Sequence, residues 1–119
     1  MKIISRKELV ALPAGTVWSY YEPCIFRDLY IKDSEPEPDY PDFSNSCLIG
    51  SVDCVSSGDF TDKCDQMEAG ESLPVDFESS GREGLFDDKQ LFAVYEPADV
   101  DILIKRLIAA NSNVRIATK

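Results

Sequence analysis

The sequence contains no histidine, and this removes the commonest general base of enzyme active sites. A cysteine nucleophile would also lack the histidine that usually activates it. Glycine-rich phosphate loops are missing as well, because the motif GREG at 81–84 has the spacing of a turn. Carboxylates are plentiful, but an acid–base pair depends on a geometry that a sequence cannot supply. We therefore expect no enzymatic activity and no cofactor, with a small carboxylate-dependent enzyme as one alternative.

Cysteine pairs of the C-x-x-C kind are absent too, although the chain has four cysteines. Their spacers of 22, 6 and 9 residues differ from the close pairs of structural zinc sites. We expect four free thiols and no metal, whereas a secreted chain would allow two disulfides. The cysteines are Cys24, Cys47, Cys54 and Cys64.

Long apolar runs are also lacking, and a membrane-spanning helix needs about 20 consecutive apolar residues. The first residues, MKIISRKELVAL, place charges inside their apolar stretch and offer no small-residue cleavage site. The sequence thus predicts no membrane association, no signal peptide and a cytoplasmic location.

Basic residues are scarce through the middle of the chain. Residues 33–101 hold 19 acidic and three basic residues, a net charge of −16, and the rest of the chain carries +6, which together give −10. Such a field repels nucleic acid and anionic lipid and attracts basic protein surfaces. We expect a basic surface of a host protein or ribonucleoprotein as the partner and no direct nucleic-acid binding. The simpler interpretation of the charge is solubility, and the oligomeric state stays open.

Alternating and β-branched segments predict five strands, most of them in neighbouring runs. This order favours a single α+β domain over residues 1–119, with a mostly antiparallel sheet. We expect one or two short helices and a C-terminal helix packed on one face of the sheet. A small, partly open barrel is the second choice. The expected strands lie at 16–23, 24–32, 47–55, 73–79 and 90–96.

Residues typical of helix ends predict three helices. Ser5 and Glu8 have the spacing of a capping box, and Thr61 is the expected cap of a helix that ends at Gly70. Pro97 opens the third helix, which we expect to end at Asn111–Asn113, before an edge strand or ordered tail. Its apolar positions recur at helical period, so we expect Leu103 and Leu107 to be buried.

The segment DSEPEPDYPDF, within an acidic proline-rich loop at 33–46, contains five acids, three prolines and no base. The prolines exclude helix and favour extended chain, in which alternate carboxylates project to one side. We predict an exposed, semi-rigid segment that binds a basic groove, because preordering lowers the entropy lost on binding. The alternative is a solvated loop that prevents aggregation. The predicted partner-binding residues are Asp33, Glu35, Glu37, Asp39, Tyr40, Asp42 and Phe43.

Two further features of the sequence are compatible with binding of a small ligand or an anion. The rings of Trp18, Tyr20 and Tyr30 could line an exposed ligand or interface surface, although alternating strands favour a place in the core. Arg82 stands alone among acids, and we favour pairing with these neighbours over contact with a bound anion.

The segments ISRKELVALPAGTVWSYYEPCIF and GLFDDKQLFAVYEPADVDILIKRL, at 4–26 and 84–107, resemble small, mostly uncharacterised accessory proteins of tailed bacteriophages. They cover under half of the chain and bring no catalytic residues. The resemblance implies an early phage protein in the bacterial cytoplasm. By analogy, it implies a counter-defence inhibitor of the anti-CRISPR kind, which occupies the basic nucleic-acid groove of a host complex.

The sequence therefore favours a non-enzymatic, phage-encoded binding protein that inhibits a host defence or nucleic-acid-handling complex through an acidic surface. A second hypothesis is a sponge that sequesters a nucleotide signal in a pocket of aromatic rings. The acidic field disfavours this second hypothesis for an anionic ligand.

Overall fold

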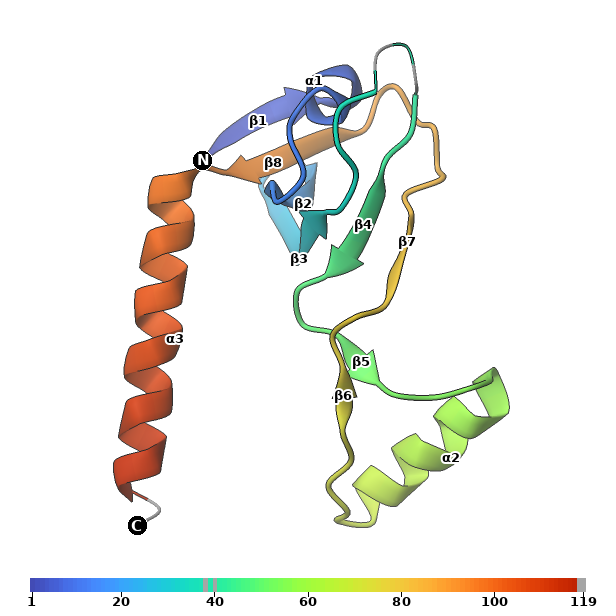
Figure 1. Cartoon of the computed structure of the whole chain (residues 1–119), viewed down its shortest axis with the longest axis vertical. Coiled ribbons are helices and arrows are strands. Elements are labelled where there is room, and N and C mark those ends of the chain that lie inside the picture. The colour runs from blue at the N-terminus through green and yellow to red at the C-terminus, as the bar shows by residue number, and fades with distance from the viewer. Residues whose placement is uncertain (38, 40, 118–119) are drawn as a thin grey trace.

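Six strands form one antiparallel sheet in the order β1-β8-β2-β3-β4-β7, and a separate two-stranded ribbon pairs β5 with β6 (Figure 1). This computed structural model describes residues 1–37, 39 and 41–117. The α+β class with a mostly antiparallel sheet is confirmed. The strands are β1 (Lys2–Ser5), β2 (Val17–Glu22), β3 (Ile25–Lys32), β4 (Ser44–Cys47), β5 (Ser51–Val52), β6 (Val75–Asp76), β7 (Ser80–Arg82) and β8 (Leu91–Tyr95). The helices are α1 (Arg6–Val10), α2 (Ser57–Glu68) and α3 (Pro97–Ala117).

The predicted hairpin of β2 and β3 is present and turns at Pro23 and Cys24. Cys24 adopts a left-handed backbone conformation, with φ 65°. The register shifts near Ser19, whose buried hydroxyl accepts a hydrogen bond from the Arg27 amide and donates one to the Arg27 carbonyl. These two hydrogen bonds replace backbone hydrogen bonds that the register shift removes, and they keep β2 paired with β3 at this point.

The core lies on one face of the sheet and centres on Trp18, which is fully buried. Its ring stacks on Tyr30 at a centroid distance of 4.7 Å and meets Phe43 and Phe92 edge-on at 5.4 and 5.3 Å. Helix α1 covers this face with buried side chains such as Leu9. The predicted capping box of Ser5 and Glu8 is formed and fixes the start of α1.

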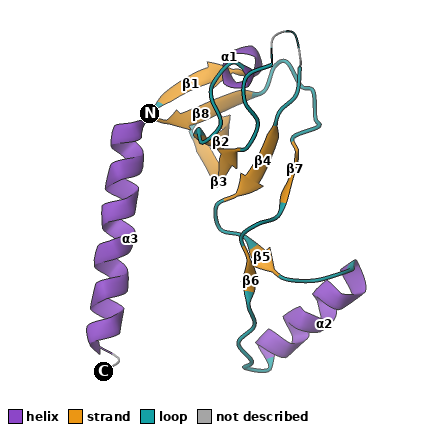
Figure 2. Ribbon diagram, viewed as in Figure 1, coloured by secondary structure: helices purple, strands orange, loops and turns teal. Residues whose placement is uncertain are grey.

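The C-terminal helix does not pack on the sheet, contrary to our expectation. Helix α3 leaves the end of β8 and projects away from the body, and none of its residues is buried (Figure 2). Leu103 is half-buried and Leu107 is 66% exposed, so their predicted burial is wrong. The physical reason is that α1 already covers the core face, while the linker of one residue, Glu96, directs α3 outward. The helix also runs through Asn111–Asn113 to Ala117, because no glycine or proline stops it there.

The chain from β5 to β6, which we call the arm, also projects from the sheet (Figure 2). A single strand was expected at 47–55, but the chain turns at Gly50, where φ is 72°. A Cβ atom there would lie 2.6 Å from the Asp76 carbonyl oxygen, so the close approach of β6 requires glycine. The cap of α2 is Ser56, not Thr61, whereas Gly70 ends the helix in a left-handed conformation as predicted.

Apart from Cys47, β4 lies in the segment 33–46 that we predicted to be a loop, and two further strands were not predicted either. β1 and β7 form the two edges of the sheet, and β7 occupies a segment that we expected to be a turn. Within the residues that the structure describes, no helix has the length and apolarity needed to cross a membrane.

Candidate functional site

The acidic loop, residues 33–43, joins β3 to β4 at one end of the sheet (Figure 1). It ends three residues earlier than expected, because β4 begins at Ser44. The side chains of Asp33, Glu35, Glu37 and Asp39 are exposed, as predicted. Tyr40 lies outside the described residues. Four carboxylates thus face solvent on a segment that two strands hold at its ends.

The start of the acidic loop is fixed by a buried lysine. Lys32, at the end of β3, is 1% exposed, and its Nζ donates to the carbonyl oxygens of Leu12 and Ser34 at 2.8 and 2.6 Å. Burial lowers the pKa of this amine, and the nearby Glu35 carboxylate opposes that shift. The Ser44 amide donates to the Ser34 hydroxyl at 3.0 Å and closes the base of the loop.

The end of the acidic loop is buried, so two predicted partner-binding residues cannot reach a partner in this structure. Phe43 is 2% exposed because its ring packs against Trp18 in the core. Asp42 is 3% exposed, and its Oδ1 accepts a hydrogen bond from the Gly84 amide at 3.1 Å. Placing Asp42 and Phe43 on the binding surface was therefore wrong, and both anchor the loop instead.

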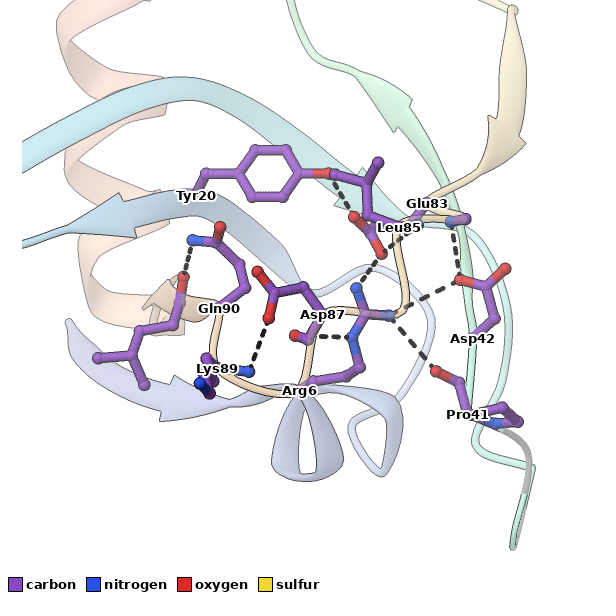
Figure 3. A network of polar contacts seen from close by, with 11 residues as sticks. Arg6, Tyr20, Pro41, Asp42, Glu83, Leu85, Asp87, Lys89 and Gln90 are labelled. Atoms are coloured by element: carbon purple, nitrogen blue, oxygen red, sulfur yellow. Dashed lines mark hydrogen bonds and ion pairs between the residues drawn. The ribbon is translucent and has the colours of Figure 1, made fainter.

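A buried polar network ties this anchor to α1 (Figure 3). Arg6 forms a buried ion pair with Glu83. Its Nη1 atom lies 3.9 Å from Oδ1 of Asp42 and donates a hydrogen bond to the carbonyl oxygen of Pro41 at 3.4 Å. Its guanidinium lies over the rings of Phe43 and Phe92, 5.8 and 5.7 Å from their centroids. One cation thus holds the loop, the core aromatics and the segment after β7 together.

Tyr20 completes the network, since its hydroxyl donates to Glu83 at 2.8 Å. Burial and this hydrogen bond to Glu83 raise the pKa of the Tyr20 phenol. The role of Arg6 was not predicted from the sequence, although the spacing of this residue indicates it. Arg6 precedes Leu9 and Val10 by three and four residues, so it shares the buried face of α1.

A cleft of about 570 Å³ opens between α1 and the acidic loop. Its apolar walls come from both elements, and carboxylates stand among its lining residues. A long basic side chain suits this combination, because its aliphatic stem can lie on apolar atoms while its charged head meets a carboxylate. The apolar residues are Val10, Ala11, Pro36 and Pro41, the acids are Glu37, Asp39 and Asp88, and the bases are Arg6 and Lys7.

Arg82 lies near acidic side chains. It is on β7, opposite Ser44, and lines a smaller cleft of about 220 Å³ together with Glu35 and Glu37. Carboxylates around a guanidinium satisfy its charge and disfavour a second anion at that point. The structure therefore gives no support to an anion contact at Arg82.

The three candidate aromatics belong to the core, as favoured from the sequence. Trp18 is fully buried, and Tyr20 and Tyr30 are half-buried against it. Trp18 cannot stack on a ligand unless the core side chains that cover its ring move apart. Burial also raises the pKa of the Tyr30 phenol, with smaller contributions from Cys47 and Asp28.

The arm adds a second acidic surface, at the opposite end of β4 from the acidic loop. None of the residues of α2 is buried. Asp59 accepts from the Val55 amide and pairs with Lys63 at 3.2 Å, and these contacts, the amide first, lower the pKa of its carboxyl. The exposed acids of α2 are Asp62, Asp65 and Glu68.

The described residues, 1–37, 39 and 41–117, include all four cysteines and every acidic residue. Among them, no group of three or more cysteine, aspartate or glutamate side chains has the geometry to hold a metal ion. All four cysteines are free, with Cys24 and Cys54 exposed and Cys47 and Cys64 half-buried. Comparison with protein-family models, with curated proteins and with solved structures finds no match for this chain.

Proposed function

We propose that this chain is a non-enzymatic binding protein that holds a basic segment of a partner protein against the acidic loop and the cleft beside it. The observation that carries the proposal is the cleft between α1 and the loop. Its apolar walls and its carboxylates, Glu37, Asp39 and Asp88, match the two halves of an arginine or lysine side chain.

The anchoring of the loop supports this proposal. Lys32 and the Arg6 network hold its two ends inside the body, while Glu35, Glu37 and Asp39 stay exposed. A loop that is ordered before binding loses less entropy when a partner docks. The charge of −10 adds long-range attraction for a basic partner, and salt should weaken that attraction.

The setting of the proposal comes from the resemblance to phage accessory proteins. We place the chain in the host bacterial cytoplasm as a counter-defence inhibitor that covers a basic, nucleic-acid-binding surface of a host complex. Spaced carboxylates on a rigid support can compete with the phosphates of a nucleic acid for the same arginines and lysines.

Capture from bacterial lysate by the tagged chain tests the proposal. A loop variant, Glu35→Gln/Glu37→Gln/Asp39→Asn, removes three charges and should lose most of the captured basic protein. An arm variant, Asp62→Asn/Asp65→Asn/Glu68→Gln, removes the same number of charges and should keep it. Equal loss in both variants would mean that only the overall charge matters and would refute a site at the loop.

A further inference from the structure

Helix α3 exposes many of its apolar side chains to solvent. Val100 and Leu103, near its start, are half-buried, but six of its other large aliphatic side chains are each at least half exposed. Exposed apolar patches of this kind mark interaction surfaces. The residues are Ile102, Ile104, Leu107, Ile108, Val114 and Ile116.

The whole chain is also too open for a compact monomer of its size. Its accessible surface is 8481 Å², whereas a compact monomer of 13.3 kDa has about 6,500 Å². Its radius of gyration is 17.0 Å, against about 13.5 Å for a compact chain of 119 residues. The two projections, α3 and the arm, give the chain its open shape (Figure 2), and the excess of about 2,000 Å² is larger than the roughly 800 Å² per partner that a standard interface needs.

The spacing of apolar residues along α3 specifies one seam. From Val100 to Ala117, steps of three and four residues in turn always reach an apolar residue. This spacing is the pattern of a helix that pairs with another helix. At 1.5 Å per residue, the 21 residues supply a contact about 30 Å long. The seam residues are Val100, Leu103, Leu107, Ala110, Val114 and Ala117.

The sizes of these side chains favour a second copy that runs antiparallel. Antiparallel pairing sets Leu103 against Val114 and Leu107 against Ala110 of the other copy, so each layer joins a larger side chain to a smaller one. Parallel pairing in register would set Ala110 against itself and Leu107 against itself. Its layers would alternate between loose and crowded packing.

Charge favours the same arrangement. Residues 1–96 carry 20 acids and eight bases, a net charge of −12, whereas α3 beyond Asp101 carries three bases and no acid. A parallel pair would bring the two acidic bodies together. An antiparallel pair separates them and places the basic end of each α3 beside the acidic first turns of the other, with Arg115 one residue from the level of Asp101.

We infer that the partner of α3 is a second copy of this chain, paired through antiparallel α3 helices. The acidic loop and its cleft lie on the body, outside the seam, so the pairing is independent of the proposed function. The dimer carries two copies of the loop, one at each end of the helix pair.

Sedimentation equilibrium on the full chain tests this inference. The wild type should be a dimer, and Leu107→Glu should raise the dimer dissociation constant by at least about 100-fold, because two unpaired carboxylates would be buried in the seam. Ile108→Glu is the matched control. It adds the same charge one residue further on, at a similarly exposed isoleucine about 100° around the helix from the seam, and should leave the dimer intact.

Three results would overturn the inference. A monomeric wild type would mean that α3 does not pair with a second copy and contacts a different protein. A Leu107→Glu variant that stays dimeric would mean that the dimer interface does not include the α3 seam. Equal dissociation of both variants would mean that the seam is misplaced. Unchanged circular dichroism and thermal unfolding of the body would show that Leu107→Glu acts on association and not on folding. Small-angle scattering fixes the direction: two bodies separated along the helix pair support antiparallel α3, and two adjacent bodies refute it.

Discussion

Replacing Arg6 by methionine should destabilise the protein strongly. Methionine keeps the apolar contact with the rings of Phe43 and Phe92 but removes the guanidinium that pairs with Glu83. Arg6 is 4% exposed, and the side chain of Glu83 has no exposure. The variant therefore leaves two carboxylates, those of Glu83 and Asp42, in the interior without their partner.

The expected loss of unfolding free energy is about 3–5 kcal/mol, which is the usual cost of breaking a buried ion pair by removing one member. Burial of both partners supports the full value, because little solvent screens the pair. This loss is a large share of the roughly 5–15 kcal/mol that stabilises a typical domain. Adding Glu83→Gln should recover part of it, since the amide oxygen can still accept from the Leu85 amide without a charge.

Urea unfolding followed by fluorescence measures this loss directly, because Trp18 is the one tryptophan of the chain and is fully buried. Lys7→Met is the matched control: it removes one charge from the next residue of α1, which is exposed, and should change stability by less than about 0.5 kcal/mol. A loss below about 1 kcal/mol for Arg6→Met would contradict the buried network, because solvent would then be screening Glu83.

Three smaller effects follow from single contacts. The pKa of Tyr20 is raised in the folded chain, so the stability that its phenol supplies is complete below pH about 10 and is lost as the pH rises further. Above pH about 10, the urea midpoint of Tyr20→Phe should therefore fall less steeply with pH than the midpoint of the wild type. Ser56→Ala removes the hydroxyl that caps α2 and should cost that helix about 1 kcal/mol. Because none of the residues of α2 is buried, this cost should appear as faster amide exchange within α2 and leave the global unfolding midpoint unchanged, and a shifted midpoint would contradict it. A thiol reagent should find four thiols after denaturation but label two of them fast in the folded chain, and equal rates would contradict the burial described here. The fast pair is Cys24 and Cys54, and the slow pair is Cys47 and Cys64.

Local signals in the sequence predicted local structure well. The capping box of Ser5 and Glu8 and the turn at Pro23 depend on residues within a few positions, and both are present. The near-continuous apolar run of β8 predicted an interior strand, and Phe92 to Val94 are buried between two neighbouring strands. The exposed half of the acidic loop followed from its prolines in the same way.

Features that depend on distant residues could not be predicted. The ion pair of Arg6 and Glu83 joins positions 77 residues apart, and β7 is a strand only because β4 offers it an edge. Helical periodicity predicted α3 but could not say what its apolar face would meet, because α1 had already covered the core. Phe43 lies in the interior for the same reason: its ring fills a gap beside Trp18 that no local pattern reveals.

Carboxyl footprinting of the protein with its captured basic partner measures the binding surface most directly. A carbodiimide couples a neutral amine to accessible carboxylates, and mass spectrometry then gives the labelling of each one with and without the partner. We expect protection of Glu35, Glu37 and Asp39, while Asp62 and Asp65 on α2, exposed in the same molecule, serve as the internal reference and keep their labelling. Protection of the α2 acids with unchanged labelling of the loop would contradict a binding site at the acidic loop.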